Sequence, residues 1–220
     1  MSKKQRHART PSANGSKLTF VPLYSFEERD RIKDELHAQT DRGAAIIGAA
    51  YLEVGLAQLL LACFVTSKKT IDEKTGKPFW HALFRDPNAP LASFSAKIRL
   101  ASALGLIGDH TEADLNRIRE IRNRFAHEFF DELSFAEQST RDRCNALWWP
   151  KNVYNVYAKD PPTELIPFPR GKVPTAPRYL YIATVVLLTN LMFGRQLGLI
   201  LNEDYKGLIE RSALKAPLLP

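Results

Sequence analysis

A short stretch near the middle of the chain combines residue types that can act on a phosphate. Residues 118–130 read IREIRNRFAHEFF, which places Arg122, Asn123 and His127 close together. An imidazole titrates near neutral pH and can serve as a general base or acid, and a guanidinium offers permanent, planar charge to phosphate oxygens. In RNA cleavage, His127 would take the proton of a 2′-hydroxyl or protonate the leaving oxygen. Arg122 would stabilise the phosphorane, and Asn123 would orient the set.

This chemistry needs no metal, and the sequence offers none. The His, Cys and acidic residues do not cluster at the spacing of metal ligands, so we expect neither a metal site nor a cofactor. The two cysteines, Cys63 and Cys144, are too few for a disulfide framework or a zinc set. We expect both to be small buried apolar groups.

On a helix over residues 114–129 the motif residues fall on different faces. The large apolar residues form one stripe, made of Leu115, Ile118, Ile121 and Phe125. Asn123 and His127 are four apart and therefore neighbours on another face. Arg122 lies on the flank of the apolar stripe and does not share a face with His127. The two can converge on one ligand only through the reach of the Arg side chain or through a second subunit.

Three charged residues are expected to support this set: Glu53, Arg119 and Lys97. Glu53 lies inside the most apolar stretch of the chain, and a buried carboxylate requires a cation. Lys97 and Arg122 are the candidate cations, and a Glu53–Arg122 pair would hold the guanidinium ready for phosphate. The alternative is that Glu53 lies on the exposed flank of an amphipathic helix.

Composition is consistent with one helical domain that binds a polyanion. The chain has 220 residues, 45% of them hydrophobic, which is enough for a single core. Its net charge of +7 favours a polyanion partner such as RNA, DNA or a membrane surface, without requiring one. The basic N-terminus lacks the apolar core of a signal peptide, so we expect a cytoplasmic location. Residues 43–65 and 179–194 are apolar, but Glu53 would be costly in a bilayer, so we expect core helices and no membrane contact.

The elements that must position the motif are all helical, because no stretch alternates with the period of a strand. The sequence predicts an all-α bundle organised as a disordered basic tail (1–19), a helical domain (20–147), a proline- and aromatic-rich wrapping loop (148–177), and a closing helix and tail (178–220). Within these parts, helices are expected from Ser25 to about Thr40, over 43–65 and 79–84, from Ser93 to Gly108, from a Thr111 cap to about Glu128, and over 135–147 and 178–203.

The motif and the text around it resemble two known groups of proteins. R-N-R-F-A-H fits the R-N-x-x-x-H signature of the HEPN superfamily, helical domains that include RNA-cleaving toxins and defence effectors. The segments PLASFSAKIRLASALGLI, LNRIREIRNRFAHE and LSFAEQ resemble the mannitol operon repressor family, which is also all-α. Together these resemblances cover about residues 40–147.

The two resemblances imply different functions. The first implies a HEPN-like, metal-independent endoribonuclease of toxin or defence type. It would act as a homodimer in which Arg122, Asn123 and His127 of both subunits face each other, and an antitoxin could bind it. The second implies a non-enzymatic transcriptional regulator that acts through a protein partner. An RNA-binding protein that has lost cleavage lies between them.

Two further pairs of adjacent residues each allow two interpretations. Trp148 and Trp149 could stack nucleobases, although such a pair more often anchors a loop on the core. Asp41 and Arg42 resemble the helix-junction pair of the mannitol repressor family. A structural junction is the preferred reading of this pair, and a role in the site is the alternative.

Overall fold

The computed structural model describes residues 26–64, 79–86, 88–128, 133–156 and 166–201, and the described part of the chain is all-α, as the sequence predicts. Its helices are α1 (Phe26–Ala38), α2 (Asp41–Cys63), α3 (Phe79–Phe84), α4 (Phe94–Ala103), α5 (Asp109–His127), α6 (Gln138–Asn145), α7 (Trp149–Val156) and α8 (Pro177–Leu201). The tail predicted over 1–19 and the polar loop before α3 lie outside the described residues.

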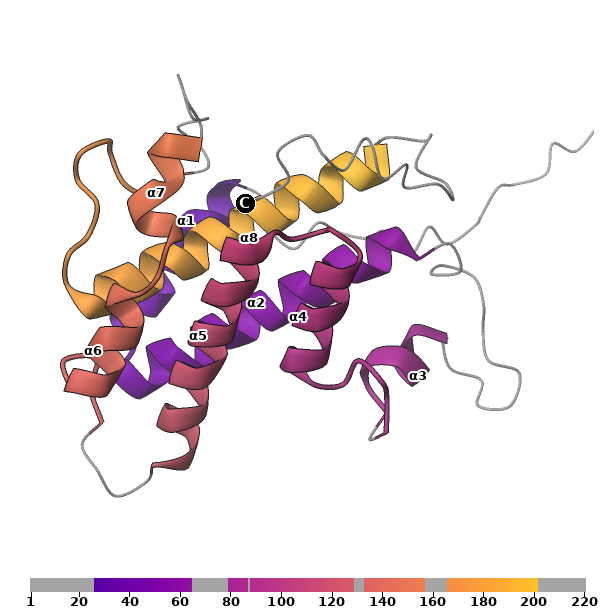
Figure 1. Cartoon of the computed structure of the whole chain (residues 1–220), viewed down its shortest axis with the longest axis horizontal. Helices are drawn as coiled ribbons and strands as arrows, with labels where there is room; N and C mark the ends of the chain where they lie inside the picture. The colour runs from indigo at the N-terminus through magenta and orange to yellow at the C-terminus, as the bar shows by residue number, and fades with distance from the viewer. Residues whose placement is uncertain (1–25, 65–78, 87, 129–132, 157–165, 202–220) are drawn as a thin grey trace, which may run out of the picture.

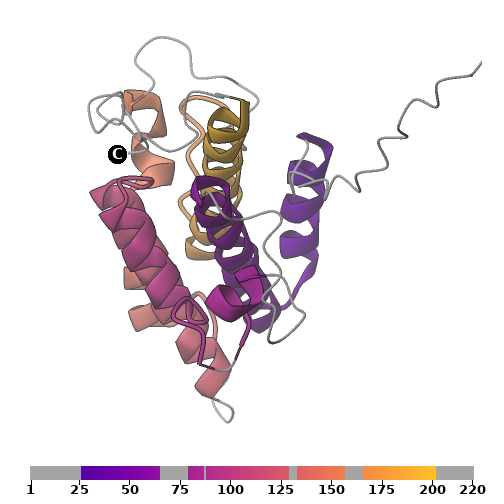
Figure 2. The same ribbon diagram turned by 90° about the vertical axis from the view of Figure 1, so that its right-hand side faces the viewer.

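The apolar helix α2 is the centre of the bundle. It packs most extensively on α8, with α1 on one side of this pair and α4 and α5 on the other (Figures 1 and 2). Two glycines of α2 allow the close approach: a Cβ at Gly48 would lie 3.0 Å from the ring of Tyr181, and one at Gly55 would lie 3.3 Å from the methyl group of Met192. By length and composition alone α2 could cross a membrane, but here it forms the core helix that the sequence predicts.

The start of α2 is a charged junction. The Asp41 carboxylate accepts hydrogen bonds from the Arg178 guanidinium (2.6 Å) and from the backbone N–H of Phe135 (2.9 Å). Arg178 also donates to backbone carbonyls at the end of α1. Arg42 donates to the carbonyl of Glu128, just after α5, at 2.6 Å. The structure therefore supports the junction reading of Asp41 and Arg42, because they tie the ends of α1, α5 and α8 together.

Two predicted helix boundaries are wrong. The helix that begins after Ser93 ends at Ala103 and not at Gly108. Gly105 has a φ of 66°, and the N–H of Leu106 closes the helix end on the carbonyl of Ala101 at 2.9 Å. The next helix begins at Asp109, so Thr111 is not its cap. The buried Thr111 hydroxyl instead accepts a hydrogen bond from the indole N–H of Trp149 at 2.8 Å.

The segment predicted as a wrapping loop contains a helix, α7. Pro150 does not prevent it, because a proline in the first turn removes an N–H that has no helical partner. The fully buried carboxylate of Asp114 accepts the backbone N–H groups of Trp148 (2.9 Å) and Trp149 (3.0 Å) at the start of this helix. A side chain on α5 thus caps α7, which local sequence could not reveal.

Removing this cap should cost stability. We expect Asp114→Ala to lower the free energy of unfolding by about 3 kcal/mol, because it leaves the buried N–H of Trp149 and the part-buried N–H of Trp148 without an acceptor. Urea denaturation followed by circular dichroism measures the change. Asp142→Ala, at an exposed position of α6, is the control and should stay close to the parent. Equal losses in the two variants would contradict the capping role.

Candidate functional site

The helix α5 holds the predicted site residues in its last two turns. Its apolar stripe is fully buried, as the spacing predicts: Leu115, Ile118, Ile121 and Phe125. The last turn of α5 projects beyond the ends of the helices around it (Figure 1). Residues in this turn can therefore meet a ligand while the stripe anchors the helix.

The three motif residues are accessible in different degrees. Arg122 and His127 are exposed, and Asn123 is half-buried. Arg122 Nη1 donates to Asn123 Oδ1 at 3.1 Å, so the amide orients the guanidinium. No hydrogen bond or ion pair joins the His127 imidazole to another described residue. Because Arg122 and His127 are five positions apart, they point roughly 140° away from each other around the helix.

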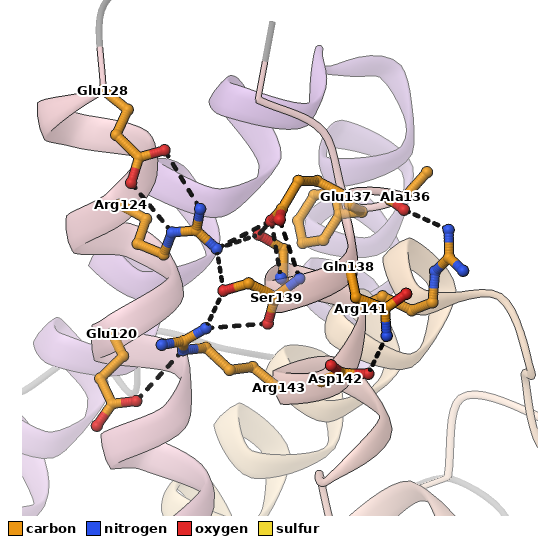
Figure 3. Close-up of polar contacts among 12 residues, drawn as sticks. Glu120, Arg124, Glu128, Ala136, Glu137, Gln138, Ser139, Arg141, Asp142 and Arg143 are labelled. Atoms are coloured by element: carbon orange, nitrogen blue, oxygen red, sulfur yellow. Dashed lines mark hydrogen bonds and ion pairs between the residues drawn. The ribbon is translucent and has the colours of Figure 1, made fainter. Parts of the chain in front are cut away.

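Arg124, which lies between the motif residues in sequence, is fully engaged (Figure 3). Its guanidinium binds the carboxylates of Glu128 (3.1 Å) and Glu137 (2.9 Å). It also donates to the hydroxyls of Ser139 and Thr140. The two carboxylates, Glu128 first, raise the pKa of Arg124. Arg124 is therefore a structural residue that fastens the end of α5 to α6.

These contacts belong to a row of polar contacts between α5 and α6, which we call the seam: Glu120, Arg124 and Glu128 on one side and Glu137, Ser139 and Arg143 on the other (Figure 3). The Glu137 carboxylate caps α6 by accepting the backbone N–H groups of Ser139 (3.0 Å) and Thr140 (3.1 Å). These two hydrogen bonds, together with Arg124, lower the pKa of Glu137 to about 2. One turn along, Arg143 lies 3.5 Å from Glu120 of α5. Positive and negative groups thus alternate between the two helices.

The supporting residues divide into two groups. Lys97, 5% exposed, binds the Glu53 carboxylate at 2.6 Å and the carbonyl of Ala92 at 3.0 Å. The cation at Glu53 is therefore Lys97, and no ion pair joins Glu53 to Arg122 in the described structure. This pair links α2 to α4 and adds no net charge. Arg119, half-buried, precedes Arg122 by three positions and shares its side of α5.

Sequence reasoning missed how residue 128 is held. The Glu128 carbonyl accepts from Arg42, and its carboxylate accepts from Arg124. The four-residue spacing of Arg124 and Glu128 is a visible signal for the second contact. No local signal marks the first contact. Because residue 128 follows His127 directly, both contacts fix the backbone next to the imidazole.

The described residues offer neither a metal site nor a reactive thiolate. No group of three or more His, Cys, Asp or Glu side chains in this part of the chain could hold a metal ion. Cys144 is buried as predicted, whereas Cys63 is half-buried. Burial raises the pKa of Cys144 to about 12 and that of Cys63 to about 11, so both thiols are protonated at neutral pH.

The seam should weaken in acid. Because the folded pKa of Glu137 is about 2, against an ordinary 4.5, its carboxylate contributes stability that is fully present above pH 4.5 and lost as the pH falls toward 2. Urea denaturation at a series of pH values should show a shallower decline for Glu137→Gln than for the parent over this interval. Asp142→Asn, at an exposed position of α6 outside these ion pairs, is the control and should decline as the parent does. Parallel curves for the parent and Glu137→Gln would argue against the cap.

Comparisons with known proteins add one likeness. No protein-family model matches the chain. No curated protein matches it either. Among solved structures, the chain is similar to one in the X-ray structure of the MtlR–HPr complex from Escherichia coli, with 21% sequence identity and a TM-score of 0.48 over 76% of this chain and 97% of that one. The all-α architecture rests on the described helices themselves and not on this likeness.

Proposed function

We propose that the end of α5 is an active site for RNA and that the protein is a metal-independent endoribonuclease of toxin or defence type, acting as a homodimer. The observation that carries this proposal is the contrast between neighbouring residues. Arg124 is held by four side chains, whereas Arg122 and His127 are exposed on a fixed helix end. The residues with suitable chemistry are thus the ones available to a ligand.

The proposed reaction is an internal transesterification. The His127 imidazole takes the proton of a ribose 2′-hydroxyl, whose oxygen attacks the adjacent phosphorus. The bond to the 5′-oxygen breaks, and that oxygen takes up a proton from water. The products are a 2′,3′-cyclic phosphate and a 5′-hydroxyl. Arg122, oriented by Asn123, stabilises the charge on the phosphorane oxygens, and Arg119 adds positive charge beside it.

The geometry of one helix supports the proposed homodimer. Arg122 and His127 point to different sides of α5, so a single subunit does not aim both at one phosphate. A second copy, placed with its α5 end against the first, supplies the missing partner. In this arrangement Arg122 of one subunit acts with His127 of the other, so the dimer holds two equivalent Arg122–His127 pairs.

Cleavage of RNA in EDTA tests the activity. We expect the parent protein to cleave and His127→Ala to be at least 100-fold slower, because the general base is lost. Arg122→Ala should be slower by a similar factor. Arg141→Ala, exposed on α6, is the control and should cleave as the parent does. Equal rates in the parent and His127→Ala would overturn the proposal. Complete inactivity of the parent would also overturn it, and would leave the regulator that acts through a protein partner.

Mixing two inactive variants tests the shared site. If Arg122 and His127 act across the subunit interface, a heterodimer of Arg122→Ala and His127→Ala contains one intact site. We expect the mixture, after subunit exchange, to regain a measurable part of the parent activity that neither variant has alone. If exchange is verified by mass spectrometry of the mixed dimer and activity stays absent, the two residues do not act across the interface.

A further inference from the structure

An aromatic stack lies at the opposite end of α5 from His127. The imidazole of His110 stacks on the indole of Trp148, with ring centroids 4.1 Å apart and an interplanar angle of 4°. His110 is exposed and Trp148 is half-buried, so the stack ends in solvent. It brings together the start of α5 and the turn before α7.

Trp148 is itself held in place by Trp149 and Asp114. Trp148 meets the edge of Trp149 at 5.3 Å and 90°, and its backbone N–H donates to the buried Asp114 carboxylate. Trp149 is 0% exposed and donates its indole N–H to Thr111. The two tryptophans therefore have separate roles. Trp149 anchors the start of α7 in the core, and Trp148 supports the exposed imidazole ring of His110.

We propose that the His110–Trp148 stack is a second RNA contact, a platform on which an unpaired base of a single-stranded RNA stacks. This inference rests on the proposed function and names the form of its substrate. Aromatic rings presented on a fixed surface bind bases of any type, because every base has a π-face. Bases of a duplex are already stacked on one another and cannot reach such a platform.

The placement of the platform fits a single-stranded RNA that runs along α5. His110 and His127 are the second and last residues of one helix, which separates them by roughly 25 Å at the usual rise. The stacked base is therefore several nucleotides from the cleaved phosphate. Arg117, two turns along the same side of α5 from His110, pairs with Asp114 at 3.0 Å, but its side chain is 34% exposed and can also meet a phosphate between the two points. Lys151, exposed on α7, adds charge beside Trp148.

The test is binding of a single-stranded RNA of about eight nucleotides, within the usual site sizes for such contacts. Its 2′-oxygens are methylated to block cleavage, and fluorescence anisotropy gives the Kd. We expect His110→Ala to raise the Kd about tenfold, because one stacking contact is lost. His110→Phe keeps a flat ring and should bind as the parent does. The control is His81→Ala, because His81 also lies against a tryptophan, Trp80, at 4.1 Å but tilted by 49°, and we expect no change there.

Three results would overturn the platform: an unchanged Kd for His110→Ala, an equal loss in His110→Phe, or equally tight binding of a duplex of the same length. A parent protein that binds no RNA would overturn it as well. The outcome is separable from the nuclease proposal. A parent that binds through His110 but never cleaves keeps the platform and loses the nuclease. A parent that cleaves, with a His110→Ala variant that binds normally, keeps the nuclease and loses the platform.

Discussion

Two arginines fix the end of α5, and the proposed site depends on that constraint. Arg124 joins Glu128 to α6, and Arg42 holds the carbonyl of the same residue from the start of α2. The backbone after His127 therefore has little freedom, although the imidazole itself is exposed. A catalytic group on a fixed backbone loses less entropy when it meets a substrate. The burial of Phe125 supplies the matching anchor on the apolar face.

The central helix connects this end to the rest of the fold. Close packing of α2 on α8, permitted by Gly48 and Gly55, sets where the first turn of α2 lies. From that turn Asp41 binds Arg178 and Arg42 reaches α5. Further along α2, the Glu53–Lys97 pair ties α4 into the same frame. The charged side chains in these contacts all bind other parts of the fold, whereas the Arg122 guanidinium on α5 is exposed.

The sequence predicted what short-range periodicity can encode. The buried stripe of α5, the break between α1 and α2 and the cap at Ser93 follow from local spacing and residue type. The early end of α4 depends on a backbone conformation at Gly105 that residue type permits but does not require. Other features involve partners far apart in the chain. Arg42 and Glu128 are 86 positions apart, and Asp114 caps a helix that begins 35 positions later.

The sequence names the candidate residues but not the partners that they have in the structure. The spacing of Arg122, Asn123 and His127 correctly separates Arg122 from the face of His127. It could not say that Lys97 would neutralise Glu53, since both Lys97 and Arg122 were chemically suitable. Nor could the sequence predict that Trp149 is buried while Trp148 stacks on an exposed ring, because both features depend on where α5 lies.

NMR shows most directly whether Arg122 and His127 meet the same phosphate, as we propose. A short RNA with a single 2′-deoxy substitution at the scissile position is titrated into protein labelled with ¹⁵N at arginine and histidine side chains. We expect the Arg122 guanidinium and His127 imidazole signals to shift together with one Kd, while the Arg124 signal stays in place. Shifts confined to Arg124, or no shift at either Arg122 or His127, would contradict the proposal.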